Sequence, residues 1–113
     1  MNNSRETLQK ITIFYQGCQR LDTNVIALAK LQAGIQASDN TKNVKTFRKI
    51  LQETMLWVLD LAKFMDALLY ELKQSNNGAY RCLAQSLRDR TKELYSTLNE
   101  FKSWIDELTP SQK

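Results

Sequence analysis

Residues capable of covalent or acid–base chemistry are few in this sequence, and none forms a catalytic pattern. The chain has two cysteines, Cys18 and Cys82, and no histidine. Cysteine and serine nucleophiles are commonly activated by a histidine base, and imidazole is a frequent zinc ligand. Asp60 and Asp66 lie about one and a half helical turns apart on a charged face, with no convergent partner. We therefore expect no enzyme activity, no metal site and no small-molecule substrate.

The glycines exclude a further class of site. Gly17, Gly34 and Gly78 are isolated from one another, whereas loops that cradle nucleotide phosphates need closely spaced glycines. We therefore expect no cofactor. With 42% hydrophobic and 25% charged residues among 113, the composition is typical of a folded globular protein. The length predicts one domain, residues 1–109, followed by a frayed tail, residues 110–113, that begins at the helix-breaking Pro110.

The cysteines are not expected to form a disulfide. In a bundle whose first and third helices run parallel, Cys18 and Cys82 would differ in height by about 13 Å, whereas a disulfide needs Cα atoms within about 7 Å. Cys18 falls on an apolar seam and is expected in the core, while Cys82 is expected on the surface beside Arg81. Residues 1–10 lack the apolar run of a signal peptide, so we expect an intracellular, cytoplasmic protein.

Basic residues form two groups that suggest an alternative function in nucleic-acid binding. The group at 42–49 comprises Lys42, Lys45, Arg48 and Lys49, and the group at 81–92 comprises Arg81, Arg88, Arg90 and Lys92. The net charge of +4 is mild, and an antiparallel bundle would separate the groups and place the first beside Glu100, Asp106 and Glu107. We therefore expect mostly solvated, partly compensated charges, and we keep nucleic-acid binding as the alternative.

The elements that carry these residues are helices, separated by two turn-forming segments. The segments QASDNTKN (36–43) and QSNNGAY (74–80) are rich in residues whose side chains bond their own backbone. They divide the chain into predicted helices at 5–36, 42–74 and 78–108. Asn3 or Ser4 would provide the N-cap of the first helix.

The apolar residues of each predicted helix lie on one face. In the first helix they are Ile11, Phe14, Cys18, Leu21, Val25, Leu28 and Ile35. In the second they are Phe47, Ile50, Leu51, Met55, Trp57, Val58, Leu61, Phe64, Met65, Leu68, Leu69 and Leu72, with Thr54 among them. In the third they are Tyr80, Ala84, Leu87, Leu94, Leu98, Phe101, Ile105 and Leu108, with Thr91 among them. Steps of three and four residues are typical of coiled-coil-like bundle packing.

We predict an all-α fold, an antiparallel up-down-up three-helix bundle with long helices. A four-helix form would arise if the first helix broke near Gly17, because glycine is about 1 kcal/mol less favourable than alanine inside a helix.

The most apolar stretch, residues 54–72, is not expected to span a membrane. It contains four charged residues, Asp60, Lys63, Asp66 and Glu71. Each would cost about 2.5–3.5 kcal/mol at the centre of a bilayer. The stretch is instead predicted to be an amphipathic core helix.

Several large apolar residues fall away from the seams and are the candidate protein interface. They are Ile13, Leu31, Leu56, Leu59, Tyr70 and Trp104, and small residues, Gly17 among them, are expected on the surface between Ile13 and Leu31. Apolar residues on the outside of a small bundle favour contact with a protein partner or another copy of the chain. The sequence thus predicts a non-catalytic interaction module: a small subunit, adaptor or chaperone-like partner in a larger or self-associated assembly.

Overall fold

A computed structural model describes residues 4–37, 41–73 and 78–108 of the protein. These residues form three α-helices: α1 (Ser4–Ala37), α2 (Thr41–Lys73) and α3 (Gly78–Leu108). The described ranges contain no strand, so the predicted all-α three-helix bundle is confirmed, with helix bounds within one residue of those expected. Asn3, one of the two predicted caps, and the predicted tail at 110–113 lie outside the described residues.

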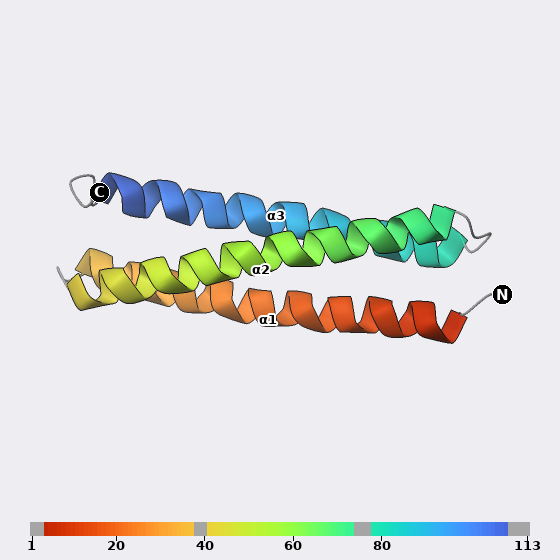
Figure 1. The fold of residues 1–113 in the computed structure, drawn as a ribbon. Helices are drawn as coiled ribbons and strands as arrows, with labels where there is room; N and C mark the ends of the chain where they lie inside the picture. Colours follow the sequence, from red (N-terminus) through yellow and green to blue (C-terminus); the bar gives the residue numbers. More distant parts are fainter. Residues whose placement is uncertain (1–3, 38–40, 74–77, 109–113) are drawn as a thin grey trace.

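The helices lie lengthwise against one another in a narrow rod of 58 × 21 × 16 Å (Figure 1). Each helix contacts both others. Lys10 near the start of α1 pairs with Glu71 near the end of α2, with 3.2 Å between Nζ and Oε2. Arg48 in α2 pairs with Asp106 near the end of α3, with 3.2 Å between Nη1 and Oδ1.

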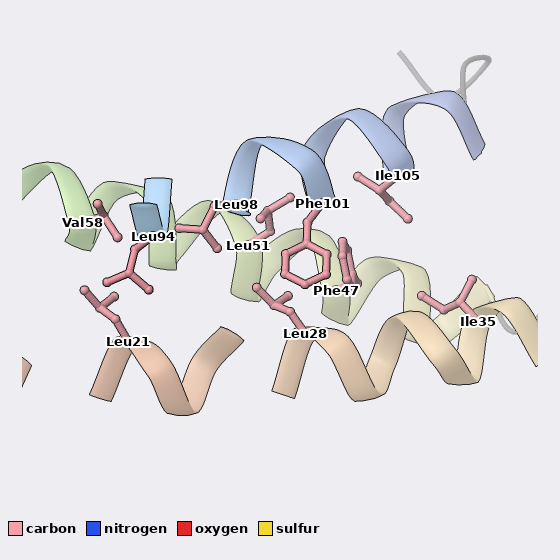
Figure 2. Close-up of a cluster of buried hydrophobic side chains, with 10 residues drawn as sticks. All are labelled: Leu21, Leu28, Ile35, Phe47, Leu51, Val58, Leu94, Leu98, Phe101 and Ile105. Atoms are coloured by element: carbon pink, nitrogen blue, oxygen red, sulfur yellow. The ribbon is translucent and has the colours of Figure 1, made fainter. Parts of the chain in front are cut away.

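The core consists of two clusters stacked along the rod. The larger contains Leu21, Leu28, Ile35, Phe47, Leu51, Val58, Leu94, Leu98, Phe101 and Ile105 (Figure 2). The smaller contains Ile11, Phe14, Cys18, Met65, Leu68, Leu72 and Ala84. Most of the predicted seam is therefore buried, and most of the remainder is half-buried. Edge-to-face contacts of Phe47 with Phe101 and Trp104, at centroid distances of 5.7 and 5.4 Å, strengthen the larger cluster.

Two predicted core positions are exposed instead. Leu108 is the last residue of α3 and lies beyond Ile105, so no further turn covers it. Phe64 lies at the edge of the apolar arc of α2, where neither neighbouring helix encloses the ring.

The helix α1 is continuous through Gly17, so the four-helix form is not confirmed. Gly17 is buried, which makes the expectation that it lies on the surface wrong. A Cβ atom at this position would lie 3.0 Å from Cδ1 and 3.1 Å from Cδ2 of Leu61. The missing side chain therefore lets Leu61 of α2 pack against the backbone of α1, an approach that a larger residue would obstruct.

Two threonines interrupt the apolar core, and both have hydrogen-bond partners within it. Thr54 donates to the carbonyl of Ile50 at 2.6 Å and accepts a bond from the amide of Asn24 at 3.2 Å. Thr91 donates to the carbonyl of Arg88 at 2.6 Å. Throughout the described helices, no buried side-chain nitrogen or oxygen lacks a partner. The hydroxyls therefore occupy the core without an unsatisfied polar group.

Candidate protein-interaction surface

Four of the six predicted interface residues are exposed. The exposed fractions are 59% for Ile13, 57% for Leu56, 42% for Leu59 and 68% for Tyr70. Leu56 and Leu59 are three residues apart on α2 and therefore share one side of this helix.

Leu31 and Trp104 are half-buried and pack against the larger core cluster. Leu31 follows Leu28 by three residues and precedes Ile35 by four, so it flanks the core seam rather than lying away from it. The ring of Trp104 leans against Phe47. These two side chains offer a partner less surface than the other four candidates.

Three hollows follow one another along the side where α2 meets α3, and together we name them the α2–α3 groove. The first is lined by residues that include Arg48, Met55, Leu56, Leu59, Tyr95, Lys102 and Asp106. The second shares Leu59 and Tyr95 with it and adds Ala62, Arg88, Lys92 and Asn99 among others. The third is lined by Asp66, Leu69, Tyr70, Lys73, Arg81 and Gln85. Three predicted interface residues thus lie along a single groove.

The first hollow, at one end of the groove, has an apolar floor. It has a volume of about 420 Å³, and Met55, Leu56, Leu59 and Tyr95 line it. Its far end carries Asp106, which bonds Lys102 at 2.7 Å and Arg48 at 3.2 Å. These cations hold the pKa of the Asp106 carboxyl below its usual value, the bond from Lys102 contributing most.

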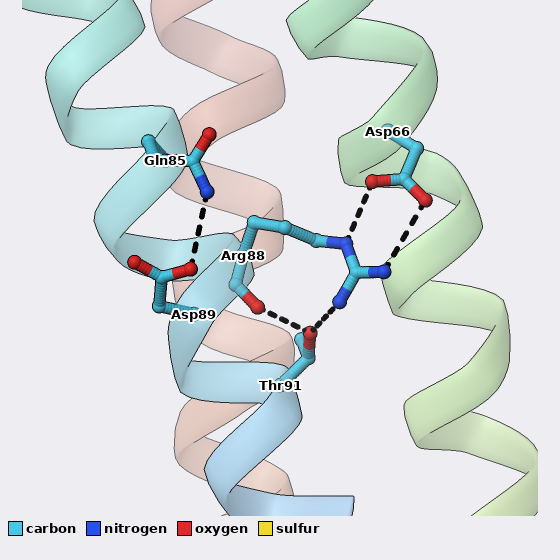
Figure 3. A network of polar contacts seen from close by, with 5 residues as sticks. All are labelled: Asp66, Gln85, Arg88, Asp89 and Thr91. Atoms are coloured by element: carbon cyan, nitrogen blue, oxygen red, sulfur yellow. Dashed lines mark hydrogen bonds and ion pairs between the residues drawn. The ribbon is translucent and has the colours of Figure 1, made fainter.

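An arginine bridges the groove between the second and third hollows (Figure 3). Arg88 of α3 donates from Nε and Nη2 to the two carboxylate oxygens of Asp66 on α2, at 2.6 and 3.3 Å. Its Nη1 donates to the hydroxyl of Thr91 at 2.9 Å, and that hydroxyl donates in turn to the Arg88 carbonyl. Because Asp66 and Thr91 both accept hydrogen bonds from the guanidinium, the Arg88 side chain has a fixed orientation in the groove.

The opposite side of α2 has a different hollow, between α1 and α2, with a volume of about 510 Å³. It is lined by Ile13, Gln16, Gly17, Gln19, Arg20, Thr23, Trp57 and Leu61. Its single charged residue, Arg20, lies over the Trp57 ring at 5.8 Å from the centroid. The structure therefore separates Ile13 from Leu56, Leu59 and Tyr70.

The predicted basic groups remain apart, and three of their arginines bind carboxylates of neighbouring helices. Arg48 pairs with Asp106 and Arg88 with Asp66, while Arg90 bonds both oxygens of Asp22 at 2.8 Å. This last carboxylate raises the pKa of Arg90. The expected partial compensation is thus present for these residues, while Lys45, Lys49, Arg81 and Lys92 are exposed.

The two cysteines lie in different surroundings. Both cysteines are free, Cys18 buried and Cys82 exposed, as predicted. Burial, with a smaller contribution from the charge of Asp22, raises the pKa of the Cys18 thiol to about 11, which disfavours its nucleophilic thiolate. Within residues 4–37, 41–73 and 78–108, no cluster of side chains could hold a metal ion, and no helix is long and apolar enough to cross a membrane.

The predicted interface includes only Trp104 from α3. It does not include Tyr95, Lys92 and Lys102, which line the groove opposite Leu56, Leu59 and Tyr70 of α2. The signal was available in part: on α3, positions 88, 92, 95, 99, 102 and 106 recur every three or four residues beside the core seam. Whether these α3 positions line a groove depends on which helix lies next to them, and the position of the core seam alone does not determine the neighbouring helix.

No family model matches this sequence, and no curated protein or solved structure is significantly similar to it.

Proposed function

We propose that this protein is a non-catalytic interaction module, a small helical subunit or adaptor that binds a protein partner along the α2–α3 groove. The observation that carries the proposal is the position of Leu56 and Leu59, both more than two-fifths exposed, on the floor of one hollow with Tyr95. Exposed apolar residues that gather in a groove with a polar rim are typical of protein-binding surfaces.

The proposal includes an up-down-up course of the three helices. The pairing of Lys10 with Glu71 supports opposite directions for α1 and α2. The pairs of Arg48 with Asp106 and of Arg88 with Asp66 support the same relation for α2 and α3. With this course α2 and α3 lie side by side, and the three hollows follow one another along them.

We also propose that the protein acts in the cytoplasm. Its two free thiols fit a reducing compartment, where disulfides are rare.

Nucleic-acid binding is the second candidate, supported by the exposed Lys45, Lys49, Arg81 and Lys92. It is the weaker one because Arg48, Arg88 and Arg90 already bind carboxylates and the two groups lie in different parts of the rod. A phosphate-binding surface would lose affinity steeply as salt increases, whereas apolar contacts would not.

The test is purification of the tagged protein from its native lysate, with nuclease and at about 300 mM salt, where phosphate-driven binding is weak. The double variant Leu56→Glu/Leu59→Glu is compared with Ile26→Glu, because Ile26 and Leu56 are equally exposed, at 57% each. We expect a stoichiometric protein partner that the double variant loses and Ile26→Glu retains. Recovery of nucleic acid alone, abolished by nuclease, would contradict the proposal.

A further inference from the structure

The α2–α3 groove carries most of the charge imbalance of the molecule. Six basic side chains line its three hollows: Arg48, Lys73, Arg81, Arg88, Lys92 and Lys102. Only two acidic ones, Asp66 and Asp106, accompany them, which leaves an excess of four positive charges. The whole sequence also has a net charge of +4, so the ten basic and ten acidic residues elsewhere balance one another. The groove is thus a positive channel on an otherwise neutral protein.

The floor between these cations is apolar. It contains Met55, Leu56, Leu59, Leu69, Tyr70 and Tyr95. From Arg81 to Asp106 the groove follows α3 for about 38 Å, at 1.5 Å per helical residue. The ion pair of Arg88 with Asp66 interrupts the apolar floor between the second and third hollows. A groove of this length between two packed helices, apolar on either side of that ion pair, fits one side of a third helix, in the helix-in-groove mode of recognition.

We propose that the partner presents an amphipathic α-helix whose apolar stripe is flanked by aspartate and glutamate, and that this helix docks in the α2–α3 groove as a fourth helix of the bundle. The inference rests on the proposed function and specifies its partner. The leucines and tyrosines of the groove bury the apolar stripe, while Lys92 on the rim, together with Lys102 beside its own partner Asp106, attracts the acidic flanks.

Charge also distinguishes this partner from a second copy of the chain. A two-fold contact of groove against groove would bring like positive charges together, which disfavours a symmetric dimer through this surface. The phosphates of a nucleic acid would pair with the cations. Leu56 and Leu59 would then lie against a charged backbone, where the burial of apolar side chains contributes little binding free energy. An acidic amphipathic helix satisfies both features.

The test uses the full-length protein and two synthetic helical peptides with the same leucine stripe, one flanked by glutamate and the other by lysine. Fluorescence anisotropy measures their binding at about 50 and about 150 mM salt, a range in which exposed charges are increasingly screened. We expect the glutamate peptide to bind at least about tenfold more tightly than the lysine peptide, with a preference that decreases as salt increases. Equal binding of the two peptides would overturn the inference.

Variants locate the binding. Lys92→Glu/Lys102→Glu should lower the affinity for the glutamate peptide about tenfold or more and should raise the affinity for the lysine peptide. Leu56→Glu/Leu59→Glu should abolish binding of both peptides. The Ile26→Glu variant should bind each peptide with the same affinity as the unmodified protein. If Ile26→Glu weakens binding as strongly as Leu56→Glu/Leu59→Glu, the site is not the groove and the inference is wrong.

Two other results would assign the groove to a different occupant and overturn the inference. One is displacement of the glutamate peptide by a single-stranded oligonucleotide whose own affinity falls steeply with salt. The other is a dimer in light scattering that Leu56→Glu/Leu59→Glu dissociates. If the lysate yields a partner that depends on Leu56 and Leu59 while the peptides show no charge preference, the proposed function stands and only this inference fails.

Discussion

The two flanks of α2 each carry a hollow but differ in packing and in charge. Toward α1, Gly17 lets Leu61 pack against the neighbouring backbone, and Arg20 is the one charged residue lining the hollow. Toward α3, Leu56 and Leu59 remain exposed in a groove lined by six cations. Leu59 and Leu61 are only two residues apart. Their different environments show that coverage by a neighbouring helix, rather than residue type, separates half-buried from exposed positions.

The largest expected difference between the flanks is in stability. Leu61→Glu should unfold the protein or destabilise it by about 3 kcal/mol, because Leu61 packs against both core clusters and a carboxylate there would lose these apolar contacts and part of its hydration. Leu56→Glu should change the free energy of unfolding by less than about 0.5 kcal/mol, as expected for an exposed position. Circular dichroism with urea denaturation measures both. Equal destabilisation would mean that Leu56 belongs to the core.

The close approach at Gly17 should give the next largest effect. Gly17→Leu should cost about 1–3 kcal/mol, because its Cβ alone would lie 3.0 Å from Leu61 and the rest of the side chain has to displace it. In a Leu61→Ala background the same substitution should cost less, since the obstructing side chain is gone and leucine favours helix over glycine. A double-mutant cycle in urea measures the coupling. Additive effects would contradict direct packing of Leu61 on Gly17.

The buried hydroxyl on the α1 flank should contribute about 1 kcal/mol. Thr54→Val keeps the shape but removes the acceptor that Asn24 uses at 3.2 Å, leaving a half-buried amide without this partner. Thermal denaturation measures the loss. In an Asn24→Ala background Thr54→Val should be close to neutral, and an undiminished loss there would contradict the role of this bond.

The smallest expected effect on stability is on the α3 flank. Asp66→Asn should cost less than about 1 kcal/mol, because the carboxylate that pairs with Arg88 is more than half exposed. The same change increases the positive excess of the groove, so the glutamate peptide should bind about twofold more tightly or better. Denaturation and anisotropy measure the two quantities separately. Weaker binding of the glutamate peptide would contradict the electrostatic account of the groove.

The core of this fold was readable from the sequence, because a helix buries residues at a fixed period. Leu94, Leu98, Phe101 and Ile105 are all buried where the steps of three and four placed them. The turn segments also located the helix bounds to within one residue. These properties depend on local spacing and local backbone chemistry alone.

The surface was readable only in part, because it depends on distances between helices. The exposure of Leu56, Leu59 and Tyr70 follows from helical phase, but the period of α1 could not show that Leu61 covers Gly17. Tyr95 joins the groove only because α3 lies against that side of α2. The packing of the three helices around the core determines which side chains of α2 are covered, and no single segment of the sequence specifies that packing.

The most direct test of the α2–α3 groove as the binding site is to map where the glutamate peptide binds, by its effect on the backbone amide NMR signals of this 13.1 kDa protein. We expect shift changes along the α2–α3 groove, at Leu56, Leu59, Lys92 and Tyr95, with little change at Gly17 on the other flank. Changes centred on Gly17 and the hollow between α1 and α2, with the groove signals unmoved, would contradict it.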